Sequence, residues 1–156
     1  MKKLIVILVS LMFLNACAAT KYTPEIPVGK MQQNKLLDDF KVFSLGYKNY
    51  ILSDEQKRMV KAWPANMSID IYFGTWCHDS QREVPKLLKA LQVNTRVTHS
   101  LIALDTHKSD PLGLAKSAAV QYTPTFIIYI NKREVGRVIE RPQKDLISDI
   151  NDMLVL

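Results

Sequence analysis

From Met67 onward, extended and helical hydrophobic patterns alternate along the chain, and this order constrains the fold more than any other feature. Met67–Phe73 has the period of two that is typical of a strand. Asp79–Gln92 carries its leucines and valine at helical spacing, which predicts an amphipathic helix. Leu101–Leu104 is a continuous apolar run, as in strands that are buried on both faces. A strand, a helix and a second strand in this order predict a parallel pair joined by a crossover.

The rest of the alternation closes the domain. Proline and turn residues separate the segments, and the last helix has one apolar stripe. A mixed sheet covered on both faces by helices, in a single α/β domain, is therefore predicted. The remaining elements are a helix from Asp110 to about Ala119, a strand over Phe126–Ile130, a turn at Asn131–Glu134, a strand over Val135–Glu140 and a helix that begins at Pro142.

Helical signals also precede the first strand. Ser53-Asp54-Glu55-Gln56 matches a capping box and predicts a helix that runs to about Trp63, before Pro64 ends it. The pattern over Lys35–Tyr50 is weaker. It predicts a short helix over Leu36–Val42 and an irregular stretch after it.

The N-terminus has the pattern of a targeting segment. Lys2 and Lys3 precede an apolar run over Leu4–Leu14, which as a helix is about 16 Å long and too short to span a bilayer. This pattern predicts a secretory signal. Leu14-Asn15-Ala16-Cys17 then resembles the lipobox of bacterial lipoproteins, in which the cysteine is acylated after cleavage. An ordinary signal peptide with an incidental Cys17 is the alternative.

The lipobox resemblance implies a domain plan and a location. Residues 1–16 are expected to be a lipoprotein signal peptide, 17–34 a lipid-anchored flexible tether, and 35–156 the domain, with its core at about 53–156. Acylated Cys17 implies attachment to the lipid bilayer of a bacterial cell envelope. Because Ala18 follows the cysteine, the resemblance implies the periplasmic face of the outer membrane.

Charge and cysteine content exclude several function classes. The formal charge of +6 falls to +4 when residues 1–16, with Lys2 and Lys3, are removed. So mild a surplus, without basic clusters or interleaved aromatic residues, gives no indication of a nucleic-acid partner. Two cysteines cannot build a disulfide scaffold or a four-cysteine zinc site.

The candidate site is a cysteine at the predicted junction between a strand and a helix. Cys77 lies where the strand ending at Phe73 gives way to the helix. The unpaired N–H groups and the positive dipole end of a helix N-terminus stabilise a thiolate, which is the reactive form of cysteine. Ser80, one turn on, is placed to donate a hydrogen bond to the sulfur. His78 favours the thiolate when protonated and Asp79 opposes it, and we expect the net shift of the Cys77 pKa to be downward.

These residues carry a resemblance to a known family. Trp76-Cys77-His78-Asp79-Ser80 resembles the active-site motif of the thioredoxin superfamily, with Ser80 in place of its second cysteine. Pro85 matches the proline of the active-site helix, and Tyr122-Thr123-Pro124-Thr125 matches the cis-proline loop. The resemblance covers the chain from about Ser53 to its C-terminus, and is nearest to a group of poorly characterised bacterial thioredoxin-like proteins.

The resemblance implies a thioredoxin-like three-layer α/β/α sandwich and a set of site residues. Cys77 and Ser80 are implied as catalytic, and Trp76, His78, Thr123 and Pro124 as the surface that binds substrate. Two departures limit the chemistry. Ser80 cannot form a disulfide with Cys77, and Ile71 replaces the buried aspartate of thioredoxins, while Asp70 points to the opposite face of the strand.

A lone nucleophilic cysteine favours monothiol exchange or isomerisation, because a second thiol must come from outside to cleave the mixed disulfide. The expected partners are thiols or disulfides of envelope proteins, or small thiols. No cofactor is expected, and the oligomeric state is not predicted.

Other interpretations stay open. The chain could be a non-catalytic module that binds extended peptides in the groove of Trp76, Thr123 and Pro124, with Cys77 an inert buried residue. Ser80 could simply satisfy backbone donors at the helix start. Cys77 with His78, His99 and His107 would make a metallochaperone, but their spacing matches no known ligand set, so no metal site is expected. Arg82 and Lys86 are predicted to lie on the solvated face of the helix.

Overall fold

The computed structural model describes residues 26–154, which form five strands and six helices. Expected and observed elements agree in type and order over the central part of the chain. In sequence order they are β1 (Gly29–Met31), α1 (Gln33–Asp39), α2 (Lys41–Asn49), α3 (Asp54–Ala62), β2 (Met67–Phe73), α4 (His78–Leu91), β3 (Thr98–Ala103), α5 (Leu114–Ser117), β4 (Thr125–Ile130), β5 (Arg133–Ile139) and α6 (Leu146–Leu154).

The strands form one mixed sheet in the order β1-β3-β2-β4-β5. β2 and β3 are parallel, as the crossover through α4 predicts, and the other three pairings are antiparallel. At the middle of the sheet Ile71 of β2 lies between Leu101 and Phe126. β2 is therefore paired on both edges, and its C-terminal end is a rigid support for whatever follows Phe73.

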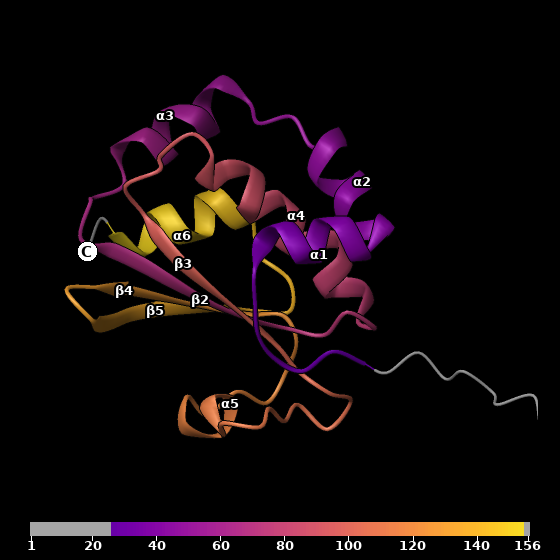
Figure 1. Ribbon diagram of the computed structural model, residues 1–156. Coiled ribbons are helices and arrows are strands. Elements are labelled where there is room, and N and C mark those ends of the chain that lie inside the picture. The colour runs from indigo at the N-terminus through magenta and orange to yellow at the C-terminus, as the bar shows by residue number, and fades with distance from the viewer. Residues whose placement is uncertain (1–25, 155–156) are drawn as a thin grey trace, which may run out of the picture.

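The two faces of the sheet are covered unequally (Figure 1). α1 to α4 and α6 lie on one face, and the single turn of α5 with its flanking loops lies on the other. The larger hydrophobic core lies under the five helices and includes Ile71, Phe73 and Leu87. A smaller core around Tyr72 and Ile127 lies under α5. The prediction of a single α/β domain with a mixed sheet covered on both faces is confirmed.

The N-terminal boundary of the domain differs from the prediction. The expected tether over 17–34 is wrong for its last residues, because Gly29–Met31 forms an edge strand antiparallel to β3, with Gly29 opposite Ala103. Three residues are too few to show a strand period, so the sequence carries no signal for β1. The rest of the expected tether and the signal peptide, including Cys17, lie outside the described residues.

Two helices replace the short helix and irregular stretch that were expected over Lys35–Tyr50. α1 and α2 are separated only by Phe40, whose backbone is extended. Leu36 and Phe43 are fully buried in the main core. α2 packs on α4 at Gly46, where a Cβ atom would lie 3.1 Å from the Pro85 ring. These helices are part of the folded domain.

Two helix starts were also misplaced. The N-cap predicted at Asp110 is wrong, because Gly113, with a positive φ of 66°, is the N-cap and only Leu114–Ser117 is helical, short of Ala119. The Asp110 carboxylate still accepts hydrogen bonds from the Leu114 and Ala115 N–H groups. The last helix begins at Leu146 instead of Pro142. Its cap is Asp145, whose carboxylate accepts hydrogen bonds from the first backbone N–H groups of α6.

Other local signals were correct. Ser53 Oγ accepts from the Gln56 N–H at 3.1 Å and Gln56 Oε1 accepts from the Ser53 N–H at 3.0 Å, which completes the capping box. β4 and β5 are joined by Asn131 and Lys132, both with positive φ, as in a two-residue hairpin turn. None of the helices within residues 26–154 has the length and apolar character needed to cross a bilayer.

Phe43 offers a test of whether α2 belongs to the cooperative core. Its ring packs edge-on against Phe73, with centroids 5.8 Å apart. Phe43→Ala should lower the free energy of unfolding by about 3–5 kcal/mol, measured by chemical denaturation. The neighbouring Val42, 44% exposed, is the control, and Val42→Ala should cost under about 0.5 kcal/mol. Equal effects of the two substitutions would show that α2 is not part of the unit that unfolds.

Candidate functional site

The site is built on the turn between β2 and α4. Gly74, Thr75 and Trp76 form that turn, and Cys77 is the N-cap of α4, with extended backbone angles. Its N–H donates to the Gly74 carbonyl at 3.1 Å and its carbonyl accepts from the Gln81 N–H at 2.9 Å. The predicted junction is confirmed, and Cys77 stands where the helix exposes its first N–H groups.

Trp76 is fixed from three sides and is half-buried. Its Nε1 donates to the Leu104 carbonyl at 3.0 Å, and Lys108 Nζ lies 5.3 Å from the ring centroid. A Cβ atom at Gly74 would lie 2.6 Å from the indole, so only glycine fits there. Trp76 therefore lines the rim of the site and is not an ordinary core residue.

The loop before β4 supplies the other wall. The Thr123–Pro124 peptide bond is cis and both residues are buried. Cys77 Sγ lies 3.0 Å from the Thr123 carbonyl oxygen, and the Pro124 carbonyl accepts from the Glu140 N–H at 2.7 Å. The cysteine, the loop and the end of β5 are thus brought together from distant parts of the chain.

The surroundings of the sulfur change its acidity. Burial raises the pKa of Cys77, but hydrogen bonds to the sulfur from the Thr123 side chain, from the Ser80 backbone and side chain and from the Asp79 N–H outweigh it. The pKa of Cys77 therefore lies below its ordinary value, as expected. The thiol can also donate to the Thr123 carbonyl, a contact that favours the protonated form and limits the decrease.

Ser80 does both things that the sequence left open. It is fully buried, and its Oγ accepts a hydrogen bond from the Gly74 N–H at 3.2 Å. The same hydroxyl is one of the groups that lower the pKa of Cys77. Ser80 thus satisfies a backbone donor and stands beside the sulfur.

The central strand carries no acid near the site. Ile71 is fully buried in the main core, under the helices. Asp70 lies on the other face with Tyr72, where burial first and the Asp70 charge second raise the pKa of Tyr72 to about 12. Asp70 is therefore no substitute for the aspartate that Ile71 replaces.

A charge network on α4 was not foreseen in this form. Arg82 Nη1 lies 2.6 Å from Asp79 Oδ1, and Arg141 Nε lies 3.3 Å from the same oxygen. Burial raises the pKa of Asp79, but its hydrogen bonds with Arg82 and Arg141 outweigh that effect and lower it. Nothing in the sequence indicated Arg141, because it is 62 residues away from Asp79.

The helix face predicted to be solvated is only partly so. Glu83 is 2% exposed, and it is held by Arg82 Nε at 2.6 Å and by Lys86 Nζ at 3.1 Å. Two long side chains therefore cover a buried carboxylate. The sequence signal for a buried carboxylate was the position of Glu83 beside Val84 and Pro85, which lie on the buried side of the helix.

The histidines do not gather. His78 is exposed at the start of α4, His107 is exposed in the loop after β3, and His99 lies near the start of β3, at the other end of the sheet. Within residues 26–154 no three His, Cys, Asp or Glu side chains are grouped to hold a metal ion. The predicted lipidation site, Cys17, lies outside the described residues.

Comparisons with solved structures find proteins with a similar fold. A Pseudomonas aeruginosa protein of unknown function is similar at 14% identity and a TM-score of 0.61, over 74% of this chain and 82% of that one. An HIV epitope-scaffold protein is similar at 16% identity and a TM-score of 0.54, over 80% of this chain and 88% of the scaffold. At such identities the likeness shows the fold alone. No match was found among curated proteins.

The family is shown by a sequence model. A family model described as thioredoxin matches residues 31–148, which include the junction, the cis-proline loop and the hairpin. Membership supports a thiol–disulfide oxidoreductase-like role in general terms. The chain belongs to the thioredoxin family.

Proposed function

We propose that this protein is a monothiol thiol–disulfide exchange protein of the bacterial cell envelope, with Cys77 as its nucleophile. The observation that carries the proposal is the environment of one sulfur. It is partly exposed, lies at the N-terminus of α4 beside the cis-proline loop, and has a lowered pKa. A partly exposed, low-pKa cysteine at a helix start is typical of reactive cysteines.

The exchange step follows from these contacts. The Cys77 thiolate attacks a client disulfide, a new bond forms between Cys77 and one client sulfur, and the other client sulfur leaves as a thiolate. Hydrogen bonds from Ser80 and Thr123 stabilise Cys77 again when it leaves in the reverse step. No other described residue is a cysteine, so an external thiol completes the cycle.

The location belongs to the same proposal. The lipobox-like Leu14-Asn15-Ala16-Cys17 supports anchoring through acylated Cys17, on the periplasmic face of the outer membrane. Clients would then be thiols or disulfides of envelope proteins, or small thiols.

A peptide-binding module without catalysis is the second candidate. Tyr122 and Ile139, 51% and 44% exposed, are supporting observations, because they lie beside the cis-proline loop, with Ile139 opposite Thr125 in the sheet. Apolar side chains on a surface suit a bound peptide. Cys77 reactivity separates the two candidates.

The hydroxyls near the sulfur predict a change in reactivity. Thr123→Val and Ser80→Ala should each raise the pKa of Cys77 and slow its alkylation at pH 7 by about fivefold, because each removes a hydrogen bond worth about 1 kcal/mol. The measurement is the alkylation rate as a function of pH. Thr95→Val, an exposed position beyond the far end of α4, is the control. A wild-type midpoint at or above that of an unstructured cysteine, about 8.5, would favour the binding module.

Restoring a second thiol should change the mechanism. Ser80→Cys should form a disulfide with Cys77 under oxidising conditions, because Ser80 lies one helical turn beyond Cys77 and its side chain is one of the groups that lower the pKa of Cys77. The variant should reduce insulin faster than wild type, since attack by the second thiol becomes intramolecular. Wild type should turn over only when an external thiol is added. Two free thiols in the oxidised variant would contradict the assigned site.

Anchoring predicts partition with membranes. The mature protein should begin at acylated Cys17 and sediment with outer membranes, whereas Cys17→Ser should be released. Cell fractionation and mass spectrometry of the N-terminus make the measurement. Recovery of wild type in the soluble periplasmic fraction would refute the anchor without touching the chemistry of Cys77.

A further inference from the structure

A polar cleft of about 600 Å³ opens beside α4, on the side toward α6. Its walls come from α4, from Tyr50 at the end of α2 and Gln56 in the first turn of α3, and from the segment that joins β5 to α6. The volume is in the range of sites for small molecules. The charged residues that line it are Arg82, Glu83, Lys86, Arg141, Lys144 and Asp145.

Both carboxylates in this lining are already satisfied by the protein. Glu83 is buried and held by Arg82 and Lys86. Asp145 caps α6 and accepts a hydrogen bond from Gln56 Nε2 at 3.0 Å. Both carboxylates are therefore paired within the protein. The charged groups of the cleft that remain open to a ligand are cations.

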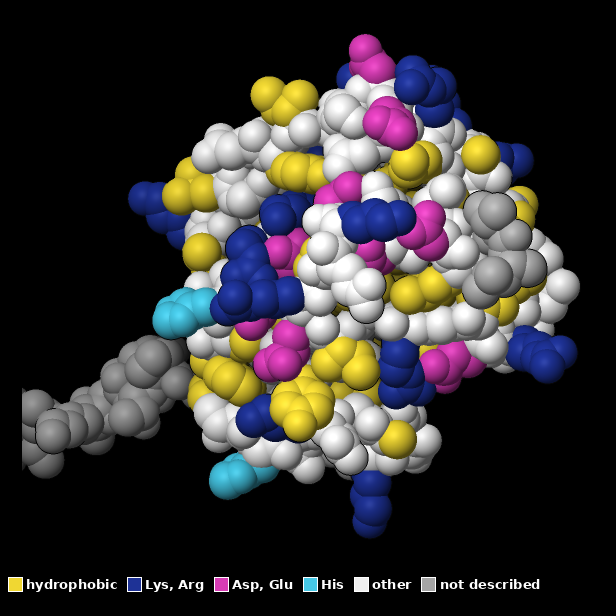
Figure 2. Space-filling view, turned by 180° about the vertical axis from the view of Figure 1, so that it is seen from behind, with side chains coloured by type: hydrophobic (Ala, Val, Ile, Leu, Met, Phe, Trp, Pro, Cys, Tyr) yellow, Lys and Arg dark blue, Asp and Glu magenta, His cyan; other side chains and the backbone are white. Residues whose placement is uncertain are grey.

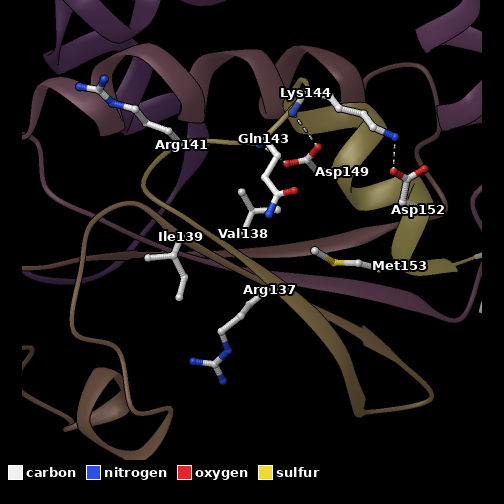
Figure 3. Close-up of a pocket in the computed structure, with 9 residues that line it drawn as sticks. All are labelled: Arg137, Val138, Ile139, Arg141, Gln143, Lys144, Asp149, Asp152 and Met153. Carbon is white, nitrogen blue, oxygen red and sulfur yellow. Dashed lines mark hydrogen bonds and ion pairs between the residues drawn. The ribbon is translucent and has the colours of Figure 1, made fainter.

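Arg141 and Lys144 are the cations most open to a ligand, with side chains 72% and 69% exposed. Arg141 touches Asp79 through Nε alone, at 3.3 and 3.4 Å, and its two Nη groups donate to no other described residue. In Figure 3 Arg141 extends away from Asp149 and Asp152, whereas Lys144 reaches Asp152. Figure 2 shows Lys and Arg side chains spread over this face of the molecule, with a group of them left of centre and Asp and Glu side chains among them.

The cleft is connected to the site of the reactive sulfur through two of its lining residues, Arg82 and Arg141. Arg82 and Arg141 both contact Asp79, two residues after Cys77. Arg141 also follows Glu140, whose N–H donates to Pro124 in the loop that touches the sulfur. Arg141 is therefore tied to both walls of the site, and a ligand that it holds can extend toward Cys77.

We propose that this cleft binds the carboxylate of a small acidic thiol, and that this thiol resolves the mixed disulfide on Cys77. The inference rests on the proposed monothiol exchange and names the external thiol that exchange requires. A guanidinium with open Nη groups suits a carboxylate, which it can bind through two hydrogen bonds. The volume favours a small molecule over a protein segment.

The reaction balances with two equivalents of the small thiol. The thiolate of the first attacks the Cys77 sulfur, the bond to the client sulfur breaks, and the client leaves as a thiolate that takes a proton from water. The second attacks the sulfur of the bound small thiol and forms the small disulfide, and Cys77 leaves as a thiolate. Two small thiols are oxidised for each client disulfide reduced.

The test uses the full chain with Cys17→Ser, so that only Cys77 carries a neutral 2-thiopyridyl label. Release of 2-thiopyridone is followed with 3-mercaptopropionate, 2-mercaptoethanol and cysteamine, which are anionic, neutral and cationic. Each rate, per thiolate, is divided by that of the same thiol with a labelled unstructured peptide. This ratio corrects for the intrinsic reactivity of each thiol. The ratio for the neutral thiol shows whether a substitution changes the reactivity of the Cys77 disulfide itself.

The ratio for 3-mercaptopropionate should exceed that for 2-mercaptoethanol by about fivefold, and cysteamine should be slowest. Arg141→Ala and Lys144→Ala should each reduce this advantage, and the double variant should abolish it. Arg133→Ala removes the same charge from the far end of β5 and should leave it intact. Added salt should weaken the advantage in wild type.

Each other result has a distinct meaning. Equal ratios for the three thiols, an advantage that survives the double variant, or one lost equally in Arg133→Ala would overturn the cleft proposal and leave the exchange function standing. Release from Cys77 no faster than from the peptide with every thiol would instead refute the proposed function.

Discussion

The contact between the Cys77 sulfur and the Thr123 carbonyl joins parts of the chain 46 residues apart, and the chemistry of the site depends on it. β2 fixes one side, because it is paired on both edges and ends at Phe73. β4 fixes the other side, since it is the antiparallel neighbour of β2 and begins directly after the cis-proline. The sheet register thus sets the separation of nucleophile and loop.

The groups around α4 change from neutral to charged with distance from the Cys77 sulfur. Next to Cys77 the sulfur meets the Thr123 carbonyl and a set of hydrogen-bond donors, and no charged side chain is among the groups that shift its pKa. One step out, Asp79 would oppose a thiolate, but two arginines compensate its charge. Further along, buried Glu83 holds Arg82 and Lys86 against the helix. Because cations pair with Asp79 and Glu83, these carboxylates, which lie within two turns of Cys77, oppose its thiolate less.

Sequence alone was sufficient where a signal is local. The period of β2, the capping box at Ser53 and the Cys77 junction each depend on a few adjacent residues, and each was predicted correctly. Signals that depend on tertiary pairing were missed. β1 is held only by its partner β3, and Arg141 reaches the site only because β5 ends beside the cis-proline loop. The start of α6 was misplaced because Pro142 is as good a helix start as Asp145 by local criteria.

The direction of β1 has a geometric consequence. Since Gly29 pairs with Ala103 at the C-terminal end of β3, the chain enters the sheet at the same end as Phe73 and the turn to Cys77. With an acyl group on Cys17, the 12 residues that lead to Gly29 reach at most about 43 Å when extended. The segment between the lipid anchor and β1 would then join the domain at the end that carries Cys77. A domain anchored as proposed would work close to the bilayer surface, and disulfides farther from the bilayer than this span would be out of its reach.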